Sequence, residues 1–310
     1  MKPLLLALVG PTASGKTEVA FELARLLPVE ILSCDSMQVY RSMPIVSQAP
    51  PAPPRGTRAH LAEFVEPTEE YSAALYRKAA EAVAREAVAR KRTPLVVGGT
   101  GLYLRALLSG LFEGDSSTAK DEEFRARLAE EEKVEGPGSL HRRLEEADAP
   151  SAARIHPNDL RRVIRALEVL HLTRVPLSVQ MKNRRGLRDE FRARIFLLAW
   201  DRAELYARID RRVERMFDEG LIEEVRGLLK IPLSLTASTA LGIREVKAYL
   251  EGAATLEQTK DLLKMNTRHY AKRQLSWFRH EPGVESVPVR AGDEPRDIAA
   301  AIFGRIGEER

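Results

Sequence analysis

Residues 10–17 read GPTASGKT, a complete G-x-x-x-x-G-K-T phosphate-binding loop. An apolar run, Leu4–Val9, precedes the loop, and a helical pattern with one apolar face follows it from Thr17 to Leu27. In this order the glycines permit a tight turn, while backbone N–H groups and the helix N-terminus face an anion. Lys16 is expected to reach the outer phosphate and the Thr17 hydroxyl to hold Mg²⁺. The motif therefore predicts binding of a di- or triphosphate, without saying which.

The bulk composition is that of an ordinary globular protein. A length of 310 residues suffices for one large or two ordinary domains with a full core. The net charge of +4 is a weak indication of an acidic partner. The single cysteine, Cys34, excludes an internal disulfide, and its apolar setting favours a buried residue over a nucleophile. Leu4–Val9 is too short to span a bilayer, and no cleavage region follows it, so we expect a cytoplasmic protein without membrane contact.

Four short apolar runs predict buried parallel strands, each leading into a loop or a helix. They are Leu4–Val9, Glu30–Cys34, Pro94–Val97 and Ile195–Ala199. A proline-rich loop (49–54) and an alanine-rich helix (72–91) separate the second run from the third. Helices that alternate with buried strands predict an α/β fold, here a P-loop NTPase-like core with a parallel sheet.

The stretch from Ser116 to Gly186 breaks this alternation. It contains no strand-like run, and glycine and proline at 136–138 and 156–158 divide it into helices, the last with Asn158 as its expected N-cap. After Trp200 the pattern is nearly all helical. We therefore predict four parts: a first part of the core (1–115), a helical insertion domain (116–190), a mostly helical second part of the core (191–285) and a C-terminal tail (286–310).

Asp35 follows the second predicted strand, and the glycine-rich turn GGTG (98–101) follows the third. Ligands bind at the carboxyl ends of the strands in open α/β sheets, so both segments are expected beside the phosphate loop. The Asp35 carboxylate is then a candidate Mg²⁺ ligand, a candidate general base, or simply a cap in a turn. In the turn, the glycines allow close backbone approach and Thr100 offers a hydroxyl.

Residues 264–280, KMNTRHYAKRQLSWFRH, carry five basic and no acidic side chains, a formal charge of +5. A basic helix with interleaved aromatic residues suits contact with RNA phosphates and stacking on bases. The alternative is an amphipathic helix whose aromatic residues pack on the core while its basic face is only solvated. A second basic cluster, Arg161, Arg162 and Arg165, favours the nucleic-acid hypothesis.

Six segments occur together in one order along the chain. They are GPTASGKT (10–17), SCDSMQVYRSM (33–43), LVVGGTGLYLRALLSGL (95–111), RIHPNDLRRVIRALEV (154–169), MFDEGLIEEV (216–225) and TRHYAKRQLSWFR (267–279). With them the chain resembles the tRNA dimethylallyltransferases, also called tRNA isopentenyltransferases, over nearly its whole length. Leu241 and Ile243 in TALGIRE (239–245) and Arg174 in HLTRVPLS (171–178) depart from the family pattern, and they concern binding detail rather than the chemistry.

The resemblance implies transfer of a dimethylallyl group from dimethylallyl diphosphate to N6 of adenosine 37, in tRNAs that read codons beginning with U. The phosphate loop would then hold a leaving diphosphate, with Mg²⁺ on Thr17, and Asp35 and Thr100 would be the catalytic residues. The implied diphosphate ligands are Gly10, Pro11, Thr12, Ala13, Ser14, Gly15, Lys16, Thr17, Arg208 and Arg212.

The resemblance also implies a monomer whose insertion helices grip the anticodon stem-loop of tRNA. The implied RNA contacts are Asp35, Ser36, Met37, Gln38, Thr100, Arg125, Asp159, Leu160, Arg161, Arg162, Val163, Thr239, Arg244, Arg268, Lys272 and Arg273.

Two other functions compete for the same phosphate loop. A small-molecule or nucleotide kinase would use the helical insertion as a lid, but this hypothesis gives no reason for the basic helix at 264–280. An RNA-binding NTPase switch would need a metal-binding aspartate after the third strand, where this chain has GGTG (98–101).

Overall fold

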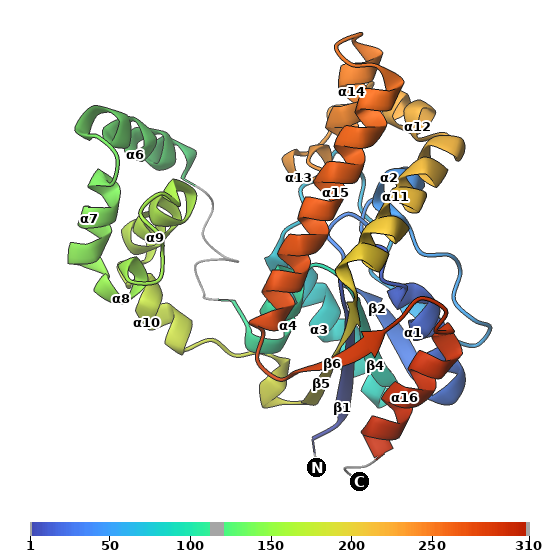
Figure 1. Ribbon diagram of the computed structural model, residues 1–310. Helices are drawn as coiled ribbons and strands as arrows, with labels where there is room; N and C mark the ends of the chain where they lie inside the picture. Colours follow the sequence, from blue (N-terminus) through green and yellow to red (C-terminus); the bar gives the residue numbers. More distant parts are fainter. Residues whose placement is uncertain (1, 112–120, 308–310) are drawn as a thin grey trace. The chain divides into compact units, whose positions relative to one another are not determined.

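The strands of the chain form a parallel sheet (Figure 1). A computed structural model describes residues 2–111 and 121–307, and within them the sheet has six strands in the order β3-β2-β4-β1-β5-β6. The strands are β1 (Leu4–Val9), β2 (Val29–Ser33), β3 (Arg58–His60), β4 (Thr93–Gly98), β5 (Arg192–Trp200) and β6 (Val284–Val289). The predicted α/β fold with a parallel sheet and a P-loop-like core is thereby confirmed.

The chain divides into two compact units, residues 1–108 with 190–310 and residues 109–189. The helices of the first unit are α1 (Lys16–Leu26), α2 (Pro44–Ser47), α3 (Ala73–Ala89), α4 (Gly101–Ser109), α11 (Arg202–Asp218), α12 (Leu221–Leu228), α13 (Leu235–Ser238), α14 (Ile243–Leu250), α15 (Leu256–Arg279) and α16 (Pro295–Gly307). Among the described residues, we find no helix with the length and apolar character needed to cross a bilayer.

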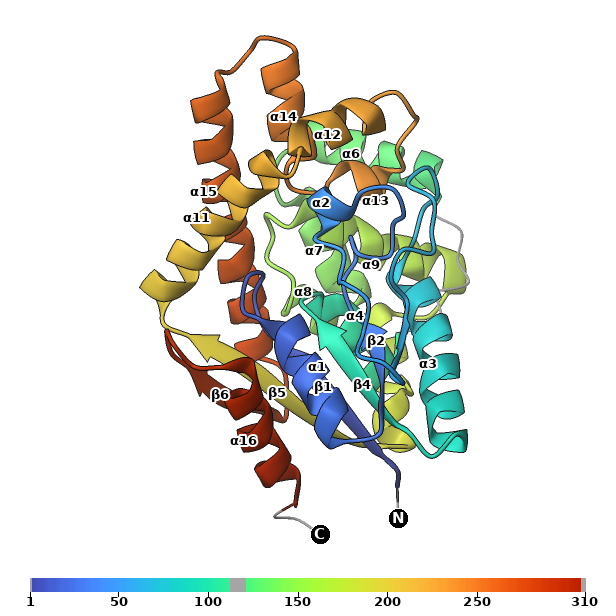
Figure 2. The ribbon, with the colours of Figure 1, turned by 90° about the vertical axis from the view of Figure 1, so that its right-hand side faces the viewer.

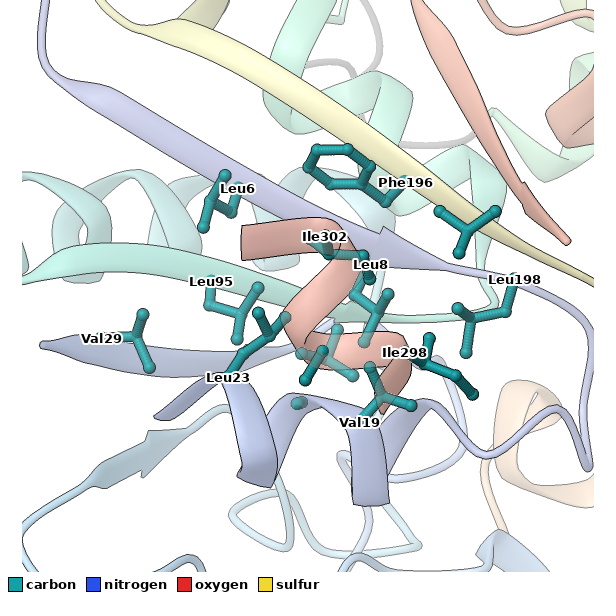
Figure 3. Packing of buried hydrophobic residues seen from close by; sticks show 14 of the residues in the cluster. Leu6, Leu8, Val19, Leu23, Val29, Leu95, Phe196, Leu198, Ile298 and Ile302 are labelled. Carbon is teal, nitrogen blue, oxygen red and sulfur yellow. The ribbon is translucent and has the colours of Figure 1, made fainter. Parts of the chain in front are cut away.

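The main core lies between the sheet and the helix pair α1 and α16, which lie side by side over one face (Figures 1 and 2). Val19 and Leu23 of α1 and Ile298 and Ile302 of α16 pack in one cluster with Leu8 of the central strand (Figure 3). All five side chains are nearly or completely inaccessible to solvent. Burying each contributes roughly 1.5–3 kcal/mol, so α16 is an integral layer of the fold.

This packing corrects the prediction of a C-terminal tail at 286–310. Within that range β6 pairs with β5 in parallel and α16 covers α1. The strand escaped prediction because VESVPV (284–289) alternates polar and apolar residues and contains Pro288, which removes a backbone donor. An edge strand tolerates such a residue, since one of its sides has no partner strand.

The second unit is a helical domain with a core of its own. Its helices are α6 (Glu122–Glu135), α7 (Ser139–Ala147), α8 (Ala149–Ala152), α9 (Leu160–Thr173) and α10 (Leu177–Lys182), followed by the short 3₁₀ helix η1 (Leu187–Asp189). Asp159 caps α9 through Oδ1, which accepts from the Arg162 N–H (3.3 Å), so the expected cap at Asn158 is wrong by one residue. The predicted boundary at 115/116 lies outside the described residues.

Candidate active site

The phosphate-binding loop connects the central strand β1 to α1. Gly15, the N-cap of α1, has φ of 85°, in the left-handed region that glycine adopts without strain. The Lys16 Nζ folds back over the loop and donates to the carbonyl oxygens of Pro11 (2.7 Å) and Gly10 (3.1 Å). Burial lowers the pKa of Lys16 to about 8, although the nearby Asp35 carboxylate opposes the shift. An anion in the loop would replace lost hydration of this ammonium group.

Side chains from distant parts of the chain hold the loop from outside. Arg208 Nε donates to the Ala13 carbonyl (2.8 Å), and Arg212, one turn later on α11, donates to the Thr12 hydroxyl (3.1 Å). The Trp200 indole N–H, at the end of β5, donates to the Ser14 carbonyl (2.9 Å). Burial lowers the pKa of both arginines, whose guanidinium groups stay charged. The two predicted diphosphate-binding arginines therefore contact the loop directly.

The turns after β2 and β4 lie against one another. The Cys34 N–H donates to the Val97 carbonyl (2.7 Å), and the Thr100 N–H donates back to the Cys34 carbonyl (3.1 Å). A Cβ on Gly98 would lie 2.1 Å from that Cys34 oxygen, so only glycine allows this approach. The strand register thus brings the segments carrying Asp35 and Thr100 together, as the sequence predicted.

The functional groups in these turns are tied to the backbone. Asp35 Oδ1 accepts from the Met37 N–H (2.9 Å), which leaves the other carboxylate oxygen for a ligand. The Thr100 hydroxyl accepts from the Ser36 N–H (3.0 Å) and lies 3.4 Å from the Ser36 hydroxyl. Burial raises the pKa of Cys34 to about 12, which makes its thiol inert, as expected for a packing residue.

A cavity of about 720 Å³ extends from the phosphate loop across these turns, and all its lining residues belong to the first unit. The predicted site residues along its wall are Thr12, Ala13, Ser14, Gly15, Lys16, Thr17, Asp35, Ser36, Met37, Gln38, Arg212, Thr239 and Arg273. The opposite wall comes from α11 and α15, which run alongside one another (Figure 2). Predicted residues from several separate segments therefore line one cavity, whereas Gly10, Pro11, Thr100 and Arg208 are not among its lining residues.

The donors around Thr17 fit Mg²⁺. Within residues 2–111 and 121–307, no group of three or more His, Cys, Asp or Glu side chains is arranged to hold a metal ion. Mg²⁺ retains waters and usually binds through one or two protein ligands together with substrate phosphates. The Thr17 hydroxyl, on the cavity wall, is the candidate for such a protein ligand.

Helix α15 has two faces with different roles. Thr267, Ala271, Gln274 and Phe278 are buried along one face, whereas Lys272, Arg273 and Arg279 are exposed on the other. The helix is therefore amphipathic with a basic outer face, which agrees with both interpretations of the 264–280 segment and does not decide between them. Arg268 is an exception, because its guanidinium forms a bidentate ion pair with Asp210 of α11.

Several side chains of the second unit that were predicted to contact RNA are buried or paired within the protein. Arg125 forms a bidentate pair with the fully buried Glu168 (2.7 and 2.8 Å), so its guanidinium is committed to the helical core. The Val163 side chain is completely buried and presents nothing to a partner, whereas Leu160 packs against the same cluster and is only half-buried. Arg161 and Arg162 are exposed, as is Arg244 of α14 in the first unit.

Sequence reasoning missed Gln274, the residue that joins the loop to the Thr100 turn. Its Oε1 accepts from the Thr12 N–H (2.8 Å), and its Nε2 donates to the Gly99 carbonyl (3.0 Å). The available indication was a polar residue placed in the buried stripe Leu263, Thr267, Ala271 and Phe278. Such a residue must find hydrogen-bond partners inside the protein.

Comparison with known proteins agrees with this geometry. The family model for IPP transferase matches residues 38–281. This chain belongs to the IPP transferase family. The tRNA dimethylallyltransferase of Geobacter sulfurreducens is 42% identical over 98% of this chain and 98% of its own length.

Solved structures extend the likeness to members of the IPP transferase family. The tRNA isopentenylpyrophosphate transferase of Bacillus halodurans is 38% identical, with a TM-score of 0.71 over 100% of this chain and 98% of that one. A eukaryotic dimethylallyltransferase acting on tRNA is 25% identical, with a TM-score of 0.84 over 99% of this chain and 80% of that one. The resemblance seen in six sequence segments is confirmed, and neither the kinase nor the switch hypothesis is favoured.

The depressed pKa of Lys16 predicts a pH-dependent anion affinity. A bound diphosphate favours the ammonium form, so binding takes up a proton once the pH exceeds about 8. We therefore expect pyrophosphate affinity to fall by up to roughly tenfold per pH unit above that value. Calorimetry from pH 7 to 9.5 measures this slope. The same titration of the matched variant Lys16→Met gives the part of the slope that comes from ionisation of pyrophosphate itself. Equal slopes for the two proteins would exclude Lys16 as the source of the pH-dependent affinity.

Proposed function

We propose that this protein transfers a dimethylallyl group from dimethylallyl diphosphate to N6 of adenosine 37 in tRNAs that read codons beginning with U, releasing diphosphate. Its membership of the IPP transferase family makes it a transferase of the prenyl-transfer type. The observation that carries the proposal is the single cavity in which the phosphate loop and Asp35 meet.

The phosphate loop supports departure of the diphosphate. As the bond from carbon to oxygen breaks, negative charge grows on the leaving oxygen, and nearby cations stabilise that charge more than they stabilise the intact substrate. Lys16, Arg208 and Arg212 supply three such cations around the loop. The α1 N-terminus adds backbone N–H groups directed at the same phosphates.

Asp35 is the general base for the incoming amine. An exocyclic adenine amine is a weak nucleophile, and a positioned base that takes its proton contributes roughly 10²–10⁴-fold. The Asp35 oxygen left free by the Met37 bond is the acceptor for that proton. Thr100, fixed through Ser36 beside it, orients the base or the diphosphate near the reacting carbon. The adenine has to leave its stack in the anticodon loop before N6 is accessible.

Thr17 is the residue that would hold Mg²⁺, through its hydroxyl. When bound, the ion supplies positive charge at the phosphate oxygens. Every other charge that the proposal requires comes from side chains of this chain.

The basic face of α15 and the exposed arginines of α9 support tRNA as the acceptor, with the anticodon stem-loop as its bound part. We further propose that the enzyme acts as a monomer in the cytoplasm, where tRNA is found. One chain suffices because the phosphate loop, Asp35, Thr100, Arg208 and Arg212 all belong to the first unit.

A labelled-transfer assay tests this function. Purified protein with dimethylallyl-labelled diphosphate and Mg²⁺ is expected to label an unmodified tRNA transcript that reads a codon beginning with U. A matched transcript with guanosine at position 37 should remain unlabelled. Equal labelling of both transcripts, or of neither, would contradict the proposal.

Charge reversal on α15 tests the RNA surface. Lys272 and Arg273 are exposed, so replacing both by Glu is expected to weaken tRNA binding without unfolding the helix. Each lost phosphate contact lowers the slope of log affinity against log salt by roughly one. The matched control reverses Lys78 and Arg92, two exposed basic residues near α3. If a salt titration gives both double variants the wild-type slope, the basic face of α15 is only solvated.

A further inference from the structure

The side-chain amide of Gln274 bridges the two halves of the candidate site. It lies on α15 and is 5% exposed. Its acceptor, Oε1, receives the Thr12 N–H of the phosphate loop at 2.8 Å, and its donor, Nε2, is 3.0 Å from the Gly99 carbonyl. The orientation of the amide is fixed by chemistry, because only the oxygen accepts from an N–H and only the nitrogen donates to a carbonyl.

The surrounding backbone is shaped around this amide. A Cβ on Gly99 would lie 2.2 Å from Gln274 Nε2, so any other residue there would expel the amide. Ala271, one turn earlier on α15, packs with Ala13 of the phosphate loop in a small buried cluster. The same helix face therefore touches the loop at Ala13 by packing and at Thr12 by a hydrogen bond.

We propose that Gln274 is a positioning residue that sets the distance between the diphosphate and the groups acting on the amine. Thr12 belongs to the loop that holds the leaving group, and Gly99 immediately precedes Thr100, whose hydroxyl is bonded to the Ser36 N–H beside Asp35. A misplacement of about 1 Å between two reacting groups costs roughly 10²-fold in rate. Gln274 lines the cavity and acts through these two backbone groups.

The inference rests on the proposed function, so its test is read as a rate of dimethylallyl transfer. Gln274→Met keeps the approximate volume and removes both hydrogen bonds. We expect its kcat to fall by roughly 10- to 100-fold while pyrophosphate affinity changes less than about fivefold, because Lys16 and both arginines remain. Thr259→Val is the matched control: it removes the hydrogen bond from the buried Thr259 hydroxyl to the Thr255 carbonyl on the same helix and should leave kcat unchanged.

Gln274→Glu gives a readout that a purely structural role would not produce. A carboxylate still accepts from the Thr12 N–H, but its second oxygen faces the Gly99 carbonyl and repels it. Protonation of the carboxyl restores the donor, so the ratio of variant to wild-type kcat should rise as the pH falls from 8 to 5. Taking the ratio removes the pH dependence of the other groups.

The outcomes separate the two proposals. Absence of transfer by the wild type and Thr259→Val would refute the proposed function itself. With an active wild type, the positioning role is overturned by a Gln274→Met kcat within threefold of normal. It is also overturned by a Gln274→Glu ratio that does not change with pH.

Discussion

Replacing Asp35 by alanine is expected to lower kcat for dimethylallyl transfer by two or more decades. The loss is one of proton handling, for which a positioned base supplies roughly 10²–10⁴-fold. The KM for dimethylallyl diphosphate should barely change, because Lys16 and the two arginines still hold the phosphates. Steady-state kinetics with saturating tRNA measure both quantities.

Asp35→Asn separates the loss of the proton acceptor from the loss of the hydrogen bond that holds the turn. Its amide oxygen still accepts from the Met37 N–H, so the fold of the turn is kept, but the side chain no longer takes up a proton. We expect the asparagine variant to be nearly as impaired as the alanine variant. Turnover within threefold of wild type in either protein would remove Asp35 from the mechanism.

Replacing Lys16 by alanine is expected to impair both binding and catalysis. The ammonium group is buried against the loop and loses hydration there, so its charge interacts strongly with a bound phosphate. We expect kcat/KM to fall by roughly 10²-fold or more. The affinity for pyrophosphate should fall less, because the charge on the diphosphate grows during bond breaking.

Lys78→Ala, an exposed lysine on α3, is the control for loss of one positive charge. Transfer kinetics and pyrophosphate calorimetry on the two variants give the comparison. A Lys16→Ala protein with normal kcat/KM would show that the loop does not hold the leaving group.

The local motifs were predictable because each rests on short-range rules. GPTASGKT with a strand before it and a helix after it specifies the phosphate loop, and Asp35 and Thr100 follow from the rule that ligands bind where parallel strands end. The strand β6 was not predictable from its own residues, because its alternating pattern and Pro288 favour a loop until β5 supplies a partner.

Contacts between distant segments were likewise beyond sequence reasoning. Arg125 and Arg268 are basic residues in basic segments, yet each is paired with a carboxylate from another helix, Glu168 and Asp210 respectively. The sequence marks Gln274 only as a polar residue in a buried helical stripe, and the fold alone places it between Thr12 and Gly99. Its partners lie far from it along the chain, and no local pattern encodes such a pairing.

The most direct test of the account is whether this phosphate loop holds a leaving diphosphate or a hydrolysable nucleotide. Pyrophosphate should inhibit transfer competitively with dimethylallyl diphosphate, and purified protein should hydrolyse no ATP with or without tRNA. Steady ATP hydrolysis stimulated by tRNA, or transfer that pyrophosphate fails to inhibit, would contradict the central claim.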